Sequence, residues 1–145
     1  MFQLRPSCPE DVPHLIDVWR RSVRATHGFL SEADFHEIET AVATMYLPNA
    51  DLTVATDSAG RLVGFMGLRN HHIDSLFLDP DSRGKGLGRQ FIDHAARVAG
   101  APLSVDVNEQ NLQAVEFYRR MGFSQTDRSP TDDDGRPYPL LHMVR

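Results

Sequence analysis

The sequence contains one cysteine, Cys8, which excludes an internal disulfide and any metal site built from several cysteines. It also lacks the run of about 18 uncharged apolar residues that a membrane-spanning helix needs. Residues 1–7 show no basic region followed by an apolar core, the pattern of a secretory signal. A lone cysteine fits a reducing compartment, so we expect a cytoplasmic protein with no membrane partner.

A basic stripe is missing as well. The 15 lysines and arginines are scattered along a chain of net charge −5, whereas nucleic-acid binders gather positive charge on one face. We therefore expect no nucleic-acid partner. The local exception is the stretch 83–89, which contains Arg83, Lys85 and Arg89. A small basic cradle on an acidic protein indicates a small anionic ligand.

The chain has no internal repeat and no low-complexity tract. With 145 residues, 41% of them hydrophobic, it is long enough to bury one core but short for two. We expect a single domain over residues 1–145.

Apolar periodicity and turn residues predict the order β-α-α-β-β-β-α-β-α-β-β. The expected strands are 2–5, 52–56, 61–69, 73–78, 103–107, 123–126 and 138–144. Ser7 and Glu10 have the spacing of a capping box before the first helix. A meander followed by alternating strands and helices predicts an α/β fold with a mixed sheet, antiparallel first and then parallel, and helices on both faces.

Residues 83–88 read R-G-K-G-L-G, between an expected strand and an expected helix. Gly84, Gly86 and Gly88 let the backbone bend tightly and approach an anion, and the helix N-terminus adds unpaired N–H groups. The spacing fits neither a Walker A loop nor a dinucleotide fingerprint, because Lys85 lies between glycines and Arg89 stands where the third glycine belongs.

The remaining pattern, [QR]-x-x-G-x-G, resembles the acetyl-CoA pyrophosphate loop of the GCN5-related N-acetyltransferase (GNAT) superfamily. Residues 76–80 (L-F-L-D-P) and 111–123 (N-x-x-A-x-x-F-Y-x-x-x-G-F) resemble two further landmarks of that family. R-A-T-H at 24–27 and P-Y-P-L at 137–140 are similar to a subgroup of small bacterial acetyltransferases. The resemblance covers essentially the whole chain. It implies a GNAT-like fold and an enzyme that moves acetyl from acetyl-CoA to a primary amine, without a metal.

The resemblance also implies a set of coenzyme A contacts. These are Leu76, Phe77, Leu78, Arg83, Gly84, Lys85, Gly86, Leu87, Gly88, Arg89, Asn111 and Tyr118. Leu76 and Leu78 would offer backbone groups to the pantetheine amides, as if to an added strand. Helix capping alone would explain Asn111 equally well.

Acetyl transfer needs a neutral amine and a proton for the departing thiolate. A lysine-like amine, with a pKa near 10.4, costs roughly 4.6 kcal/mol to deprotonate at pH 7, so a general base is valuable. In the family such bases often lie on the strand before the loop, which points to His72 and Asp74 on one face of that strand. Both could instead merely solvate the start of the strand. Tyr118 matches the family tyrosine that protonates the thiolate.

The acceptor is expected to be a small-molecule or peptide amine. His27 and Tyr138 belong to segments that border the acceptor site in the family. The acidic run 132–134 would attract a cationic amine, or is simply a solvated loop. No residue stands out as an acyl-carrying nucleophile, which favours direct transfer in a ternary complex. Because dimers are common in the family, the resemblance is also compatible with a homodimer.

Two other readings stay open. A non-catalytic acyl-CoA-binding or sensor module would keep the glycine-rich loop without a working acceptor site. An iron site of His72, Asp74 and His142 would make an oxygenase, but the predicted helices do not suit a jelly roll and the loop would have no purpose.

Overall fold

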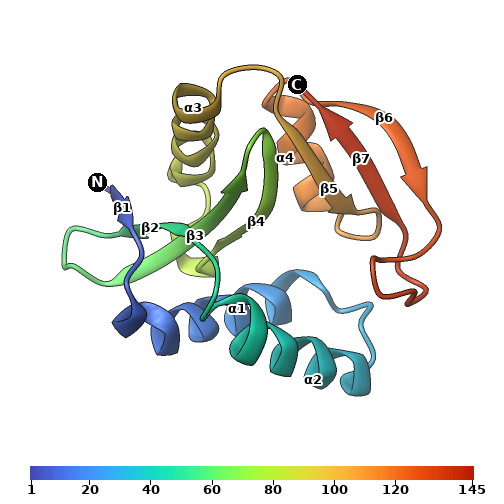
Figure 1. Cartoon of the computed structure of the whole chain (residues 1–145), viewed down its shortest axis with the longest axis horizontal. Coiled ribbons are helices and arrows are strands. Elements are labelled where there is room, and N and C mark those ends of the chain that lie inside the picture. Colours follow the sequence, from blue (N-terminus) through green and yellow to red (C-terminus); the bar gives the residue numbers. More distant parts are fainter. The chain divides into compact units, whose positions relative to one another are not determined.

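The computed structural model describes residues 1–145, and its elements follow the predicted order (Figure 1). The strands are β1 (Gln3–Pro6), β2 (Leu52–Thr56), β3 (Leu62–Arg69), β4 (His72–Leu78), β5 (Ser104–Asn108), β6 (Ser124–Ser129) and β7 (Leu140–Val144). The helices are α1 (Val12–Thr26), α2 (Glu32–Ala41), α3 (Leu87–Ala99) and α4 (Leu112–Arg120). Short turns of other helix types are η1 (Pro9–Asp11), η2 (Val42–Tyr46) and η3 (Pro80–Ser82). No helix combines the length and apolar character that crossing a membrane requires.

The strands form a mixed sheet in the order β1-β2-β3-β4-β5-β7-β6. β1 with β2 and β2 with β3 are antiparallel. β4 and β5 form the parallel pair, and β7 runs antiparallel to both β5 and β6. The predicted α/β fold, with antiparallel N-terminal strands continuing into a parallel pair, is confirmed.

The chain divides into two compact units, Met1–Gly67 with Ser75–Gly88, and Leu68–Asp74 with Arg89–Arg145. A single domain over residues 1–145 stays a prediction, and each unit is described by itself.

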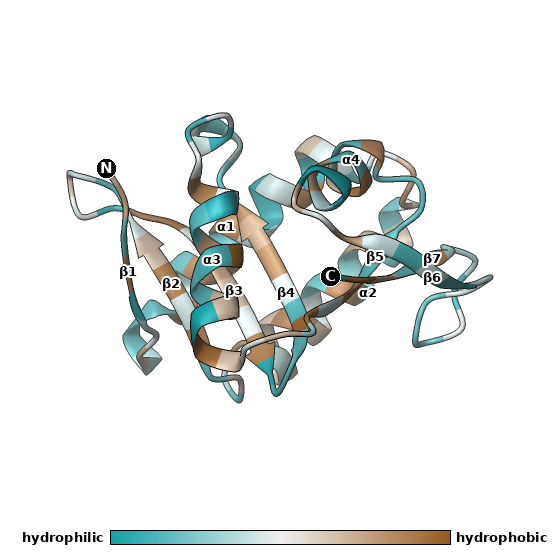
Figure 2. Ribbon diagram, turned by 90° about the horizontal axis from the view of Figure 1, so that it is seen from above, coloured by the Kyte–Doolittle hydropathy of each residue, from teal (hydrophilic) through white to brown (hydrophobic).

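The first unit is built on the amphipathic pattern of α1. Figure 2 shows β2 and β3 as predominantly hydrophobic strands. The core that joins α1, α2 and these strands consists of Leu15, Val18, Trp19, Val23, Phe35, Leu47, Leu52, Val54 and Phe65. The rings of Trp19 and Phe35 lie 5.5 Å apart and dock α2 onto α1. Each such buried side chain stabilises the fold by about 1.5–3 kcal/mol relative to exposure.

The predicted capping box of Ser7 and Glu10 is wrong by one residue. Ser7 instead extends the strand pairing, since its N–H donates to the Leu52 carbonyl at 2.8 Å and its hydroxyl accepts from the Leu52 N–H at 3.3 Å. The capping position falls to Cys8, whose N–H donates to the Asp11 carboxylate at 2.9 Å. Tertiary pairing therefore outcompetes the local serine cap.

In the second unit, β5 alternates strictly between its two faces. Val105 and Val107 are buried, while Ser104 and Asp106 point to the more open face. β7 follows the same rule at its centre, with Leu141 and Met143 buried around a partly exposed position 142. β6 is solvent-exposed along nearly its whole length and hydrophilic (Figure 2). This unit thus has a polar sheet face that carries side chains from several strands.

Candidate functional site

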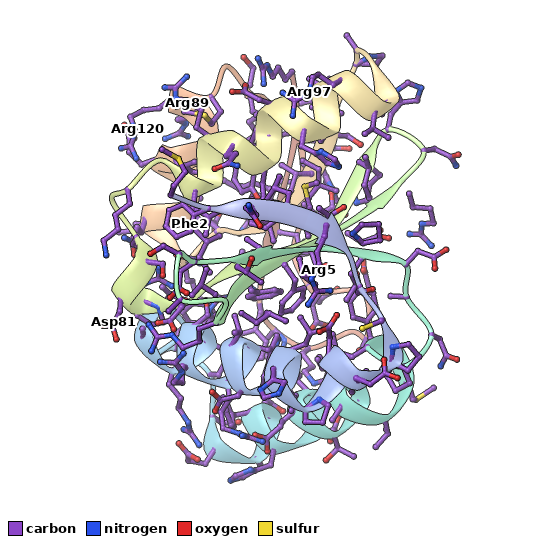
Figure 3. The ribbon with its side chains drawn as sticks, turned by 90° about the vertical axis from the view of Figure 1, so that its left-hand side faces the viewer. Phe2, Arg5, Asp81, Arg89, Arg97 and Arg120 are labelled. Carbon is purple, nitrogen blue, oxygen red and sulfur yellow. The ribbon has the colours of Figure 1, made fainter.

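The glycine-rich loop has the backbone that its sequence predicts. Gly84 and Gly86 adopt φ values of 75° and 84°, a left-handed region that side chains rarely tolerate. A Cβ built on either residue meets no atom within 4 Å. Leu87, which is 1% exposed, anchors the start of α3, while Lys85 and Arg89 are exposed and Arg89 extends from the first turn of α3 (Figure 3). The loop therefore offers open space, free N–H groups and positive charge to an anion.

Two polar links tie α1 to this loop. Arg21 donates to the fully buried carboxylate of Asp79, which also accepts the Asp81 N–H at 3.0 Å. Arg83 donates to the Ser22 hydroxyl at 3.1 Å. Burial lowers the pKa of Arg83, against the opposing effect of the Asp79 charge. The Arg83 side chain is thus turned toward α1, where it fixes the loop rather than only adding charge to it.

His27 lies near the same arginine. Burial, together with the charge of Arg83, lowers the pKa of His27 to about 4. The Thr26 hydroxyl donates a hydrogen bond to the Ser22 carbonyl at 2.9 Å, and its oxygen lies 2.7 Å from His27 Nδ1. The hydroxyl oxygen must then accept a hydrogen bond from the Nδ1–H group. His27 is consequently an uncharged imidazole at neutral pH.

The strand β4 begins with a parallel pairing to β5. Registered pairing between β4 and β5 covers only two positions, with His72 opposite Ser104 and Ile73 opposite Val105. Leu76, Phe77 and Leu78 form the end of this strand. A strand backbone can bind an extended ligand that has its own amides.

Tyr118 is a buried phenol on α4. It is 6% exposed, and the rings of Phe117 and Phe123 lie edge-on at 5.1 and 5.3 Å. Burial raises the pKa of Tyr118 well above its usual range, so the phenol is protonated at neutral pH and can act as a proton donor. The Phe123 N–H donates to the Tyr118 carbonyl at 2.9 Å after Gly122 turns at φ 93°. The sequence motif F-Y-x-x-x-G-F thus supports the turn after α4 in addition to supplying the phenol.

Two asparagines flank the start of α4. Asn111 caps the helix, since its side-chain oxygen accepts the Ala114 N–H at 3.2 Å. Asn108, at the end of β5, has a buried side-chain oxygen with no hydrogen-bond partner. A buried orphan acceptor is costly unless a donor reaches it. Sequence reasoning missed Asn108 because it belongs to no motif, and only its burial reveals it.

The predicted histidine base has a different carboxylate neighbour than expected. Asp74 accepts a hydrogen bond from Arg69 at 2.9 Å. The carboxylate near His72 is Asp106, whose Oδ2 lies 3.6 Å from His72 Nε2. The registered partner of His72 on β5 is Ser104, and Asp106 follows two residues later on the same face of that strand. The register of β5 thus places this acid within reach of the imidazole.

The residues near the C-terminus that were predicted to border the acceptor make contacts within the chain, and an arginine offsets part of their negative charge. Tyr138 is buried and its N–H donates to the Arg136 carbonyl at 2.8 Å. Arg136 lies 3.5 Å from the carboxylate of Asp132 and 2.9 Å from that of Asp134. No group of three or more His, Cys, Asp or Glu side chains is arranged to hold a metal ion.

The sequence model of the acetyltransferase (GNAT) domain matches residues 18–143. The chain belongs to the GNAT family and is an acetyltransferase. Among its relatives is the peptidyl-lysine N-acetyltransferase YjaB of Salmonella typhimurium, which is 49% identical over 144 residues, covering 99% of this chain and 98% of the relative. YjaB of Escherichia coli is 47% identical, with coverage of 99% and 97%.

Solved structures agree with this family. The solution structure of apo YjaB from Escherichia coli matches with a TM-score of 0.93 at 46% identity, covering 99% of this chain and 97% of that one. The PaiA N-acetyltransferase of Thermoplasma acidophilum, solved with coenzyme A, shares the fold at a TM-score of 0.81 and 22% identity, with 98% coverage of both chains.

Each unit of this GNAT chain offers groups whose chemistry suits a part of coenzyme A. The space beyond Gly84 and Gly86 is open to a ligand. In the second unit, the Asn108 oxygen lacks a donor. An anionic pyrophosphate and an amide-bearing arm have the chemistry that these groups lack.

Proposed function

We propose that this acetyltransferase moves an acetyl group from acetyl-CoA to the side-chain amine of lysine in peptides or proteins, by direct attack in a ternary complex. The observation that carries the cosubstrate is the R-G-K-G-L-G loop, with left-handed Gly84 and Gly86 leading directly into α3. The names of the relatives with 49% and 47% identity support a peptidyl-lysine acceptor. Acetyl-CoA is the acyl donor that this chemistry requires.

Binding of the cosubstrate is divided along the chain. The N–H groups at the start of α3 hold the pyrophosphate, with Lys85 and Arg89 adding positive charge. The backbone of Leu76, Phe77 and Leu78 pairs with the pantetheine arm. Asn111 contacts the cofactor in addition to capping α4.

In the reaction, the lysine ammonium gives one proton to His72, and the neutral amine attacks the thioester carbonyl. The C–N bond forms, the C–S bond breaks, and the thiolate takes a proton from Tyr118. The second proton lost from the nitrogen restores the Tyr118 phenol, and His72 releases its proton to solvent. The base matters because deprotonating the amine costs roughly 4.6 kcal/mol at pH 7. Asp74, on the same strand face as His72, is the second candidate for the base. His27, which is uncharged, and Tyr138 line the acceptor site.

The test is thiol release from acetyl-CoA with a lysine-containing peptide. For Tyr118→Phe we expect kcat to fall by about 100-fold or more, as for the loss of a general acid, while calorimetric binding of acetyl-CoA changes little. Gly86→Glu serves as the blocked-loop control and should bind no acetyl-CoA. A folded wild type that binds acetyl-CoA but acetylates no amine would support the non-catalytic sensor module instead.

A further inference from the structure

A chain of polar side chains crosses the open sheet face of the second unit. His142 Nδ1 lies 2.6 Å from Asp106 Oδ1, and His142 Nε2 lies 2.6 Å from the Ser129 hydroxyl. On the other side, His72 Nδ1 lies 2.8 Å from the Ser104 hydroxyl. The side chains of His72, Asp106 and His142 are 32%, 31% and 30% exposed. They are therefore fixed by contacts yet open to a ligand.

The two oxygens of Asp106 have different positions in this chain. A carboxylate only accepts hydrogen bonds, so His142 Nδ1 donates to Oδ1 and holds the carboxylate in place. Oδ2 faces His72 Nε2 across 3.6 Å, which is too long for a hydrogen bond. One oxygen is thus anchored and the other is available.

His72 completes the arrangement. Its Nδ1 is engaged with Ser104, and in the tautomer that donates from Nδ1 its Nε2 presents a lone pair. Nε2 and Asp106 Oδ2 then form two acceptors side by side. A primary ammonium carries three N–H donors and can reach both at once.

Charge favours the same ligand. Asp74 and Glu109, two other acids of this unit, each accept a hydrogen bond from an arginine, and the Asp127 carboxylate accepts the Arg128 N–H. Asp106 is bonded to an imidazole instead, which leaves its negative charge uncancelled by a guanidinium. A cation is the natural partner, and an acceptor with a carboxylate beside its amine is repelled.

We propose that Asp106 is the specificity residue for the acceptor: its Oδ2 binds the ammonium and places it against His72 Nε2, and His142 positions the carboxylate. The ligand class is a primary amine that is cationic and has no adjacent carboxylate, such as a lysine side chain. This inference rests on the proposed function, because it describes the acceptor half of the same reaction.

The first test compares kinetics of Asp106→Asn with wild type. We expect the KM for a lysine peptide to rise roughly 10- to 100-fold, as for a lost charge-assisted hydrogen bond, with kcat and the KM for acetyl-CoA changed little. Methoxyamine, an uncharged nucleophile, should show no such change. Asp93→Asn, which removes an exposed carboxylate from α3, is the matched control, and Asp106→Glu should restore part of the affinity.

A second test needs no turnover. Titration of the wild type with butylammonium should shift the NMR signals of the His72 ring, and Asp106→Asn should abolish that shift. If the wild type proves inactive with every amine, this titration still decides the acceptor site separately from the proposed function. An unchanged KM for the lysine peptide in folded Asp106→Asn, or an unchanged titration, overturns the inference. Should Asp106→Asn fail to fold, Asp106→Ser removes the same charge with a smaller side chain.

Discussion

Gly67 on β3 gives the sharpest stability prediction. A Cβ added there would lie 2.3 Å from Tyr46 Oη and 2.8 Å from Ser75 Oγ, distances that real Cβ contacts do not reach. These oxygens cannot move independently, because they lie 2.7 Å apart and Ser75 Oγ also accepts the Gly67 N–H at 3.0 Å. Gly67→Ala must therefore disrupt two hydrogen bonds and overpack a buried site.

The expected cost follows from these two effects. Two hydrogen bonds contribute about 1 kcal/mol each, and overpacking costs about 1–3 kcal/mol, so we expect Gly67→Ala to lower the free energy of unfolding by about 3–5 kcal/mol. For a chain of this length the Tm should fall by roughly 10–15 °C. Urea and thermal unfolding followed by circular dichroism measure both quantities.

A double-mutant cycle isolates the cause. Tyr46→Phe alone should cost about 1 kcal/mol, because it removes one hydrogen bond. It also removes the oxygen nearest to the new methyl group, so Gly67→Ala with Tyr46→Phe should be less destabilised than the sum of the single changes by about 1–2 kcal/mol. Strict additivity, or a Gly67→Ala variant as stable as wild type, would refute the reasoning.

Three further predictions concern the site. Ser22→Ala removes the acceptor that holds Arg83 and should weaken acetyl-CoA binding about fivefold by calorimetry, with kcat at saturation unchanged; equal affinity would contradict a positioning role. The depressed pKa of His27, about 4 against an ordinary 6.5, means that the unfolded chain binds more protons between these values. Stability should fall as pH drops through that window, by about 3 kcal/mol at most and about 1–2 kcal/mol after allowing for partial exposure, and His27→Gln should flatten the acid limb of urea unfolding. Asn108→Ala removes an orphan acceptor and should raise the Tm of the free protein slightly while weakening acetyl-CoA binding about five- to tenfold; a variant that loses stability and keeps its affinity would show that Asn108 serves the fold alone.

The order of elements was predictable because it depends on local patterns. The alternation of Val105 and Val107 with polar neighbours marks β5 and also assigns its faces. Glycines with positive φ, such as Gly100 and Gly122, end helices where the sequence predicts. Such features need only the residues themselves and their nearest neighbours in the chain.

The partners of the site residues were not predictable, because they depend on register and packing. Strand alternation places Asp74 on the same face as His72, but it does not indicate that Asp106 of β5 lies 3.6 Å from the imidazole. In the same way, nothing in the sequence indicates that Asp79 is fully buried against Arg21. A carboxylate between a leucine and a proline is typical of a loop at the end of a strand, and only the packing shows that it is buried.

The two histidines that sequence reasoning selected have opposite surroundings, and this assigns them different tasks. His27 is buried beside the positive charge of Arg83, so its protonated form is disfavoured and it would bind an incoming proton poorly. His72 has a carboxylate 3.6 Å from its outer nitrogen, and this neighbouring negative charge favours a cationic ligand beside the imidazole. A general base for a lysine acceptor must approach an ammonium and then hold its proton. Of the two imidazoles, only His72 has a neighbouring carboxylate that can bring the ammonium within reach. Replacing His72 by Gln should therefore lower kcat with the lysine peptide, whereas His27→Gln should leave the proton-transfer step intact.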